Sequence, residues 1–258
     1  MELTKANYHS IQANAEYWSV SQFKSFMDCQ ARAYAEIYEK YEKPKTDALL
    51  MGSYVDAWFQ GATALDNLLG NHPEMFNKRT GELKAQYQKA DKAIRRAEMD
   101  PMFMSYLSGT PQVLMTGELF DEDWKILVDF LHDDKIVDLK FMKDMKPIYK
   151  DGEWKPFIDA WGYDIQGYVY QQIVKQNIGE ELPFYLAVIT KEEVPDIELI
   201  HIPQWRLNGV ASLVEHYIAE FSPIKRGVRL PVRCETCDYC KQTKRLTRPK
   251  EYEELLDE

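Results

Sequence analysis

The chain has 258 residues, with 32 Lys or Arg against 42 Asp or Glu, and its formal net charge is −10 at pH 7. Hydrophobic residues make up 45% of the sequence, which is enough for a sizeable core and excludes a wholly disordered chain. The excess of acidic residues excludes a uniformly basic nucleic-acid coat, and four cysteines are too few for a disulfide scaffold.

The sequence has no segment typical of a membrane helix, because no run reaches the ~18 apolar residues that crossing a bilayer requires. Residues 1–10 lack the basic and apolar regions of a signal peptide. We therefore expect a cytoplasmic protein with no membrane contact. In such a reducing compartment, clustered cysteines usually bind metal.

The N-terminal third predicts helices. Apolar residues at helical spacing predict one helix over 17–41, capped by Ser19 or Ser21. Two more helices are expected over 48–60 and 77–99. The last of these is rich in Lys and Arg, which is typical of a solvated helix face.

The middle of the chain predicts strands. Three short β-rich runs, separated by acidic connections, favour an antiparallel meander over 113–120, 125–131 and 135–141. The following pattern predicts, in order, a helix, two strands and a helix, over 164–177, 183–190, 197–202 and 203–221. This order indicates an α/β fold with a mixed central sheet flanked by helices.

Charged residues interrupt two of the apolar strands of the meander. Asp129 lies in one strand, and Asp138 and Lys140 lie two residues apart on one face of the next. Burying an ionised carboxylate costs on the order of several kcal/mol unless the carboxylate is paired or bound to a metal. Two converging carboxylates favour Mg²⁺ or Mn²⁺. The alternative is an ordinary ion pair at a sheet edge.

The four cysteines suggest one metal site. Cys234, Cys237 and Cys240 have the spacing Cys-x2-Cys-x2-Cys, and Cys29 lies in the first predicted helix. Thiolates this close need a soft cation to offset their repulsion, and four sulfurs suit either Zn²⁺ or a 4Fe–4S cluster. The alternative for Cys29 is a small buried side chain.

The segment 223–250 is basic although the whole chain is acidic. It contains nine Lys or Arg and two acidic residues. A basic segment on an acidic protein is typical of a contact with a polyanion, and the alternative is a solubilising tail around the cysteines. The candidate phosphate contacts are Lys225, Arg226, Arg229, Arg233, Lys241, Lys244, Arg245 and Arg248.

The order Asp129, then Asp138-Leu139-Lys140, then Gln166-Gly167-Tyr168-Val169-Tyr170 resembles the PD-(D/E)XK nuclease superfamily. Within it, the pattern is similar to the RecB-like exonucleases, in which a Gln-x-x-x-Tyr helix follows the catalytic strand. The resemblance implies a restriction-endonuclease-like fold, a single nuclease domain over 1–258, and a position of Gln166 and Tyr170 on the DNA side of the site.

Two further positions are similar to family motifs. Gly52 to Asp56 resembles a Gly-x-x-x-His helix with aspartate in place of histidine, and Glu118 occupies the place of an extra acid. The resemblance implies that Asp56, Asp129, Asp138 and the Leu139 carbonyl hold Mg²⁺ or Mn²⁺. It also implies that Lys140 positions the attacking water and that Glu118 completes the metal environment.

One branch of this family holds an iron–sulfur cluster through one early cysteine and three late ones. Trp18 to Phe23, followed by Cys29, resembles the entry helix of that branch. The resemblance implies a structural 4Fe–4S cluster on Cys29, Cys234, Cys237 and Cys240, with Zn²⁺ as the alternative. Segment 223–250 would then close onto the N-terminal helix.

The function implied by the resemblance is a metal-dependent exodeoxyribonuclease of the RecE type, acting at duplex DNA ends in phage or prophage recombination. Implied partners are DNA ends and a single-strand annealing protein, with an oligomer left open, in a bacterial or phage-infected cell. The alternatives are a nuclease-fold protein that binds DNA or a partner without cutting, and a cysteine-metal interaction module.

Overall fold

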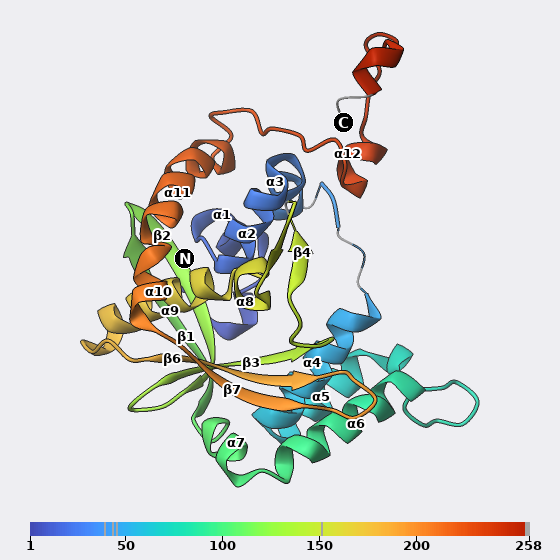
Figure 1. Cartoon of the computed structure of the whole chain (residues 1–258), viewed down its shortest axis with the longest axis vertical. Helices are drawn as coiled ribbons and strands as arrows, with labels where there is room; N and C mark the ends of the chain where they lie inside the picture. The colour runs from blue at the N-terminus through green and yellow to red at the C-terminus, as the bar shows by residue number, and fades with distance from the viewer. Residues whose placement is uncertain (39, 43, 45, 151, 256–258) are drawn as a thin grey trace.

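The structure, a computed structural model, describes residues 1–38, 40–42, 44, 46–150 and 152–255. Its centre is a five-stranded mixed sheet with the order β1-β2-β3-β6-β7 (Figure 1). Only the β3–β6 pair is parallel. The strands are β1 Thr110–Leu119, β2 Glu122–Leu131, β3 Ile136–Met142, β6 Phe184–Thr190 and β7 Ile197–Ile202. The predicted α/β fold and the meander are confirmed, and the architecture is restriction-endonuclease-like.

Helices cover both faces of the sheet (Figure 1). The amino-terminal helices are α1 Ile11–Glu16, α2 Val20–Asp28, α3 Gln30–Ile37, α4 Asp47–Gln60, α5 Ala62–Asn71, α6 Ala85–Glu98 and α7 Pro101–Tyr106. The later helices are α8 Phe157–Ala160, α9 Tyr163–Ile178, α10 Gln204–Gly209, α11 Ala211–Lys225 and α12 Asp238–Gln242. A small hairpin, β4 Ile148–Lys150 and β5 Glu153–Lys155, stands apart from the main sheet. Short 3-10 turns are η1 Lys5–Asn7, η2 Pro73–Met75 and η3 Tyr252–Leu255.

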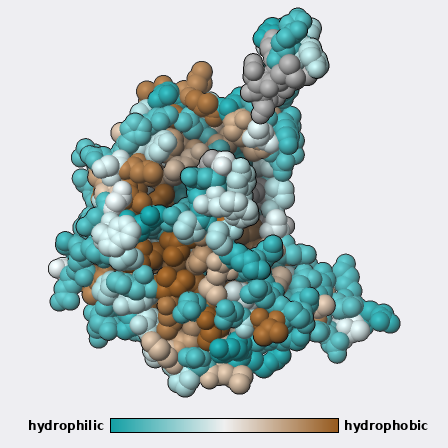
Figure 2. Space-filling model, viewed as in Figure 1, coloured by the Kyte–Doolittle hydropathy of each residue, from teal (hydrophilic) through white to brown (hydrophobic). Residues whose placement is uncertain are grey.

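The hydrophobic core has two parts, one on each face of the sheet. The first part contains Phe23 of α2, Val169 of α9, Phe221 of α11 and Trp124 of β2. In the second, residues of α4 and α6 pack on the other face of β3 and β6. On the surface, Figure 2 shows a largely hydrophilic face with hydrophobic residues gathered in its central part. No helix of the described residues is long and apolar enough to cross a membrane.

The expectation of a single helix over 17–41 is wrong, because the helix is interrupted at Cys29. Ser19 caps α2, and its side chain accepts a hydrogen bond from the backbone N–H of Gln22 at 3.3 Å. Cys29 then adopts an extended conformation, with φ −164° and ψ 108°, and ends α2. Its sulfur accepts a hydrogen bond from the Arg32 N–H at 3.5 Å and so caps α3. The break therefore places the Cys29 sulfur at a helix N-terminus.

Other element boundaries also differ from expectation. The helix expected over 77–99 begins only at Ala85, because Asn77 forms a turn whose N–H donates to the Glu82 carbonyl at 2.7 Å. The helix expected over 203–221 is two helices that meet at Val210. Helices α5 and α7 and the β4–β5 hairpin were not expected. The helix over 48–60 and the strands over 183–190 and 197–202 are confirmed.

A glycine lets α9 lie close to the sheet. A Cβ at Gly167 would come within 2.7 Å of Phe184 on β6 and within 2.8 Å of Leu207 on α10. Any larger residue would push the helix outward, because both neighbours belong to the packed core. The neighbouring residue, Gln166, is thereby held against β3.

Candidate active site

The site forms where two strands of the sheet separate. Backbone pairing of β2 with β3 is limited to two residue pairs and ends at Phe130 and Val137. Strand β3, in contrast, is paired with β6 over its whole length. The next residues, Asp129 and Asp138, therefore lie at the mouth of the gap between β2 and β3.

The carboxylate of Asp129 lies within this gap. Its Oδ2 accepts a hydrogen bond from the backbone N–H of Leu139 at 3.0 Å, and its Oδ1 accepts one from Gln112 Nε2 at 3.2 Å. The N–H and C=O groups of a strand residue point to the same edge. The Leu139 carbonyl consequently faces the gap, beside Asp129, and not the β6 ladder.

The buried side chains of β2 change from one face of the sheet to the other at Asp129. Trp124, Ile126 and Val128 pack into the core on the α9 face, whereas Phe130 packs into the core on the α6 face. On β1, the residue opposite this change is Gln112, which has a φ of +52°. A left-handed conformation of a non-glycine residue costs about 1–3 kcal/mol, so the surrounding packing must hold it in place.

Asp138 is buried, with 2% of its surface exposed. Its Oδ1 accepts a hydrogen bond from Gln166 Nε2 at 2.6 Å. Its Oδ2 forms an ion pair with Lys140 Nζ at 2.5 Å. An ionised carboxylate has about four lone-pair sites, so Asp138 retains acceptor capacity for a metal ion.

Lys140 carries the positive charge of the site. Burial alone would lower the pKa of Lys140, but the negative charges of Asp138 and Asp129 outweigh burial and raise it. The ammonium also lies 5.1 Å from the centre of the Tyr163 ring. Lys140 is therefore a cation and a hydrogen-bond donor in this state.

A second lysine approaches the same ring from α2. Lys24 Nζ lies 5.4 Å from the centre of the Tyr163 ring and donates a hydrogen bond to the Trp161 carbonyl at 2.9 Å. Burial, and then the positive charge of Lys140, lower the pKa of Lys24 to about 8. Two ammonium groups thus lie near the Tyr163 ring.

Asp56 reaches the site from α4. Its Oδ2 accepts a hydrogen bond from Gln60 Nε2 at 3.1 Å. Burial, followed by the negative charge of Asp138, raises the pKa of Asp56 to about 6. Burial and the charges of Asp138 and Asp56 raise the pKa of Asp129 well above its usual range. The three carboxylates repel one another, which a divalent cation would relieve, so the residues present fit Mg²⁺ or Mn²⁺.

The Gln-x-x-x-Tyr residues lie on α9, and both bind protein groups. Gln166 is buried and holds Asp138, while the Tyr170 hydroxyl donates to the Leu127 carbonyl of β2 at 3.2 Å. Burial raises the pKa of Tyr170 well above its usual range, so it remains a neutral donor. Tyr170 therefore fixes α9 to the strand that carries Asp129.

The expectation for Glu118 is wrong. Glu118 is exposed and lies opposite Asp123, six positions along β2 from Asp129. At ~3.3 Å per residue this separation is about 20 Å, too far to share a metal ion with Asp129. The hairpin register carries Glu118 to the far end of the β1–β2 pair.

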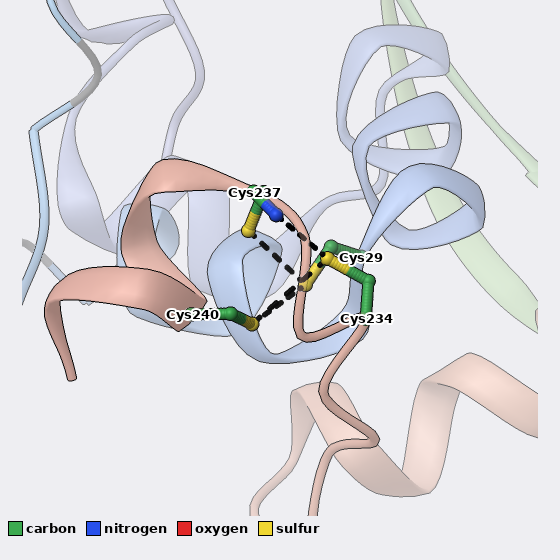
Figure 3. Close-up of side chains that lie close together, drawn as sticks. All are labelled: Cys29, Cys234, Cys237 and Cys240. Carbon is green, nitrogen blue, oxygen red and sulfur yellow. Dashed lines mark hydrogen bonds between the residues drawn. The ribbon is translucent and has the colours of Figure 1, made fainter. Parts of the chain in front are cut away.

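The four cysteines converge from the two ends of the chain (Figure 3). Their Sγ atoms all lie within 4.8 Å of one another, with separations of 3.6 Å for Cys29–Cys240, 3.8 Å for Cys29–Cys237 and 3.9 Å for Cys234–Cys240. These distances exceed the ~2.05 Å of a disulfide, and all four are free thiols. Such a set of sulfurs could hold a metal ion or cluster.

Backbone contacts accompany this convergence. The Ala31 N–H donates to the Val232 carbonyl at 3.0 Å, and the Val232 N–H donates to Gln30 Oε1 at 2.8 Å. The segment before the late cysteines therefore lies along α3.

Lys225 is not a surface residue, so its expected phosphate contact is wrong. It is 3% exposed, and its Nζ donates to the Tyr17 carbonyl at 2.7 Å and to Gln22 Oε1 at 3.2 Å. The ammonium also lies 4.3 Å from the centre of the Trp18 ring system. Burial lowers the pKa of Lys225 to about 7. This lysine joins the N-terminal segment to α11.

The other expected phosphate contacts divide into two groups. Three arginines form ion pairs: Arg226 with Glu122, Arg229 with Glu220 at 3.8 Å, and Arg233 with Glu235 at 2.7 Å. Exposed cations include Lys241, Lys244, Arg245 and Arg248. Arg233, Lys244 and Arg245 line a cavity of about 780 Å³ beside Cys234.

Sequence reasoning missed four residues of the site: Lys24, Gln60, Gln112 and Tyr163. Gln60 lies four residues after Asp56 on one helix, a spacing that does predict contact. The others come from elements distant in the sequence, and no local pattern identifies them.

Comparison with known proteins agrees with this geometry. Residues 19–243 match the family described as a PDDEXK-like domain of unknown function (DUF3799), and the chain belongs to that family. It is similar to the crystal structure of a "Putative exonuclease" from Eubacterium rectale, with 42% sequence identity, a TM-score of 0.94, and coverage of 99% of this chain and 98% of that one. No curated protein matches the chain.

Proposed function

We propose that the protein is a metal-dependent exodeoxyribonuclease that hydrolyses DNA phosphodiester bonds from duplex ends. The observation that carries this proposal is the meeting of Asp129, Asp138 and Lys140 at the gap between β2 and β3. Membership of the PDDEXK-like family and the similarity to the Eubacterium rectale protein support a nuclease.

In this proposal, Asp56, Asp129, Asp138 and the Leu139 carbonyl hold Mg²⁺ or Mn²⁺. When bound, the divalent ion supplies charge for the scissile phosphate and lowers the pKa of a water. Gln166 keeps Asp138 turned toward the gap through its 2.6 Å hydrogen bond. Tyr170 keeps α9 in register with β2, which preserves that bond.

Lys140 orients the attacking water and stabilises the negative charge that develops on the oxygens of the scissile phosphate. Because Asp138 and Asp129 raise its pKa, it begins as an ammonium and acts as a donor. A positioned cation in a site largely closed to solvent acts more strongly than it would in water.

The whole chain, 1–258, would act as one nuclease domain whose segment 223–250 is held to the N-terminal helix by a structural metal on the cysteines. We propose a 4Fe–4S cluster there, with Zn²⁺ as the alternative. The exposed cations Lys241, Lys244 and Arg245 would contact DNA phosphates. A RecE-type role in phage recombination, beside a single-strand annealing protein and with a possible oligomer, completes the proposal.

The decisive experiment digests end-labelled linear DNA with Mg²⁺. Blunt duplexes with a blocked 5′ or 3′ end are compared with single strands and a covalently closed circle. Stepwise loss of nucleotides from linear DNA, with the circle intact, supports an exonuclease, and the blocked ends give its polarity. Lys140→Ala and Asp138→Ala should abolish cutting, whereas Lys143→Ala, whose side chain is 94% exposed on the same segment, should not. Absence of cutting with both Mg²⁺ and Mn²⁺ would reject the proposal.

A further inference from the structure

A cavity of about 310 Å³ lies between α2, the β4–β5 hairpin and the start of α9. Lys24, Lys150, Trp161 and Tyr163 line it. Tyr163 connects the cavity to the site, because its ring also lies 5.1 Å from Lys140 Nζ. The cavity is therefore adjacent to the lysine proposed to act in hydrolysis.

The wall of this cavity contains an exposed aromatic side chain. Trp161 is 52% exposed and Met27 is 39% exposed, and both line the cavity. An exposed tryptophan in a concave site is suited to a flat ligand such as a nucleobase, because bases stack on aromatic side chains. The volume is near the lower end of pockets that hold small ligands, ~300 Å³.

Two cations supply the charge of the cavity. Lys24 donates one hydrogen bond, to the Trp161 carbonyl, and Lys150 donates one to the Ala160 carbonyl at 3.1 Å. An ammonium has three N–H donors, so each lysine retains donors for another acceptor. One bond goes to the Trp161 carbonyl and the other to the carbonyl of the preceding residue, so both ammonium groups are held at the segment that carries Trp161.

The negative charges of two acidic residues that line the cavity are paired with arginines outside it. Asp28 lies 3.4 Å from Arg32, and Asp159 pairs with Arg206. Neither arginine lines the cavity. The paired carboxylates repel an anion less than free ones would, so the cavity favours a ligand with an aromatic ring and a phosphate.

We propose that this cavity binds an unpaired nucleotide of the DNA strand being cut, with its base against Trp161 and a phosphate at Lys24 and Lys150. The inference rests on the proposed nuclease function and specifies part of its substrate. A base can lie on an indole only after leaving its partner. The site should therefore engage a frayed or single-stranded end.

The test measures binding without cleavage, in EDTA, by fluorescence anisotropy of labelled eight-nucleotide single strands. One strand carries all its bases, and a series carries one abasic position at successive places. We expect wild type to lose about tenfold in affinity at one abasic position. Trp161→Ala should bind the intact strand about tenfold more weakly and no longer distinguish that abasic position, while Trp161→Phe should retain the difference.

Trp154→Ala is the matched control. Trp154 is 71% exposed on the neighbouring hairpin, contacts Tyr149 with 5.6 Å between ring centres, and does not line the cavity. It should behave as wild type. If Trp161→Ala still distinguishes the abasic position, or if Trp154→Ala loses the difference equally, the nucleotide site is rejected.

Lys24→Met tests the phosphate part of the site. It should weaken binding of intact and abasic strands equally, and lower the dependence of log affinity on log salt by about one phosphate contact. An unchanged salt dependence would reject the assignment of Lys24. These binding measurements are separate from DNA digestion. If the protein cuts DNA but does not distinguish the abasic position, only the nucleotide site is rejected. If it distinguishes the abasic position but does not cut DNA, only the proposed function is rejected.

Discussion

Asp129 Oδ2 accepts the backbone N–H of Leu139 at 3.0 Å, where a β-ladder bond between β2 and β3 would otherwise form. A side chain thus replaces a main-chain partner at the point where the two strands separate. The Leu139 backbone therefore faces a carboxylate, and the gap contains an anionic oxygen from β2 and a carbonyl oxygen from β3, two donor types that suit a divalent cation.

Asp129→Asn should separate this structural bond from the proposed metal ligand. The amide oxygen can still accept the Leu139 N–H, so we expect the fold and its thermal stability to persist. DNA digestion should fall by about 100-fold or more, because a neutral amide is a weak ligand for Mg²⁺. Asp133→Asn, in the exposed turn of the same meander, should leave digestion unchanged. Equal activity of both variants would contradict the role of Asp129.

Asp56→Asn should make the metal-free protein more stable at neutral pH. A carboxyl whose pKa rises to about 6 on folding destabilises the folded state once it ionises, so the penalty appears between about pH 4 and 6 and is complete above pH 6. The variant should unfold at a higher temperature than wild type at pH 7.5 and at the same temperature near pH 4. Each kcal/mol corresponds to roughly 2–4 °C.

The same variant should bind the metal more weakly. Thermal unfolding with and without 10 mM Mg²⁺ measures this, because a ligand of the folded state raises the melting temperature. Wild type should be stabilised more at pH 7.5 than at pH 5, where Asp56 is protonated. A Mg²⁺ shift in Asp56→Asn as large as that of wild type would show that Asp56 is not a ligand.

The meander could be predicted because its strands are short β-rich runs separated by acidic connections. The pairing of neighbouring runs in turn predicts that Asp129 approaches Asp138. The metal-ligand role of Asp56 remains a prediction, now placed beside Asp138 by the structure. The break at Cys29 could not be predicted, since apolar periodicity continues through it and neither glycine nor proline marks it. The helix ends where Cys29 makes its tertiary contacts with Cys237 and Cys240, which are distant in the sequence.

Residue type alone does not locate two charged residues. The order of the sequence suggests that Glu118 lies near Asp129, but the hairpin register takes it away. Lys225 has the type of a surface cation, but backbone and amide oxygens accept its hydrogen bonds in the core. The β4–β5 hairpin does have a local signal, Gly152, which has a φ of +83°.

Burial of Lys225 predicts a pH dependence of stability. Its pKa falls from the usual ~10.4 to about 7 in the folded protein, so between pH 7 and 10 the unfolded state binds more protons. Stability should therefore rise with pH over this range, by up to about 1.4 kcal/mol per pH unit from this group. Lys225→Met should flatten that rise in urea unfolding, and the exposed Lys241→Met should not.

The cysteine site predicts a bound metal with a structural role. Anaerobically purified protein should be brown and absorb near 400 nm if it holds a 4Fe–4S cluster, and Cys237→Ser should lose that absorbance. Stoichiometric zinc in colourless protein would reject the cluster and support the alternative. In either case Cys237→Ser should increase cleavage within the surface segment 228–232 by limited proteolysis, because Cys237 helps to hold that segment beside α3.

The exposed cations of the C-terminal segment predict salt-dependent binding. Replacing Lys241, Lys244 and Arg245 together by Gln should weaken binding of a DNA duplex end and flatten its dependence on salt by about three phosphate contacts. Triple replacement of Lys78, Arg79 and Lys84, exposed on the turn before α6, provides a control of equal charge. An unchanged slope in the first variant would exclude the segment from the DNA contact.

Because Cys29 meets three cysteines at positions 234–240, the order of synthesis matters for assembly. The strands and helices that carry the acids are made before residue 234, so the nascent chain can complete its sheet while Cys29 is still without partners. A metal held by all four cysteines, as proposed, would be enclosed only after residue 240 has been made. A chain without that metal would keep its sheet but lose the link between Cys29 and the basic segment 223–250, so under the proposed function the supply of metal would set how tightly the protein binds DNA.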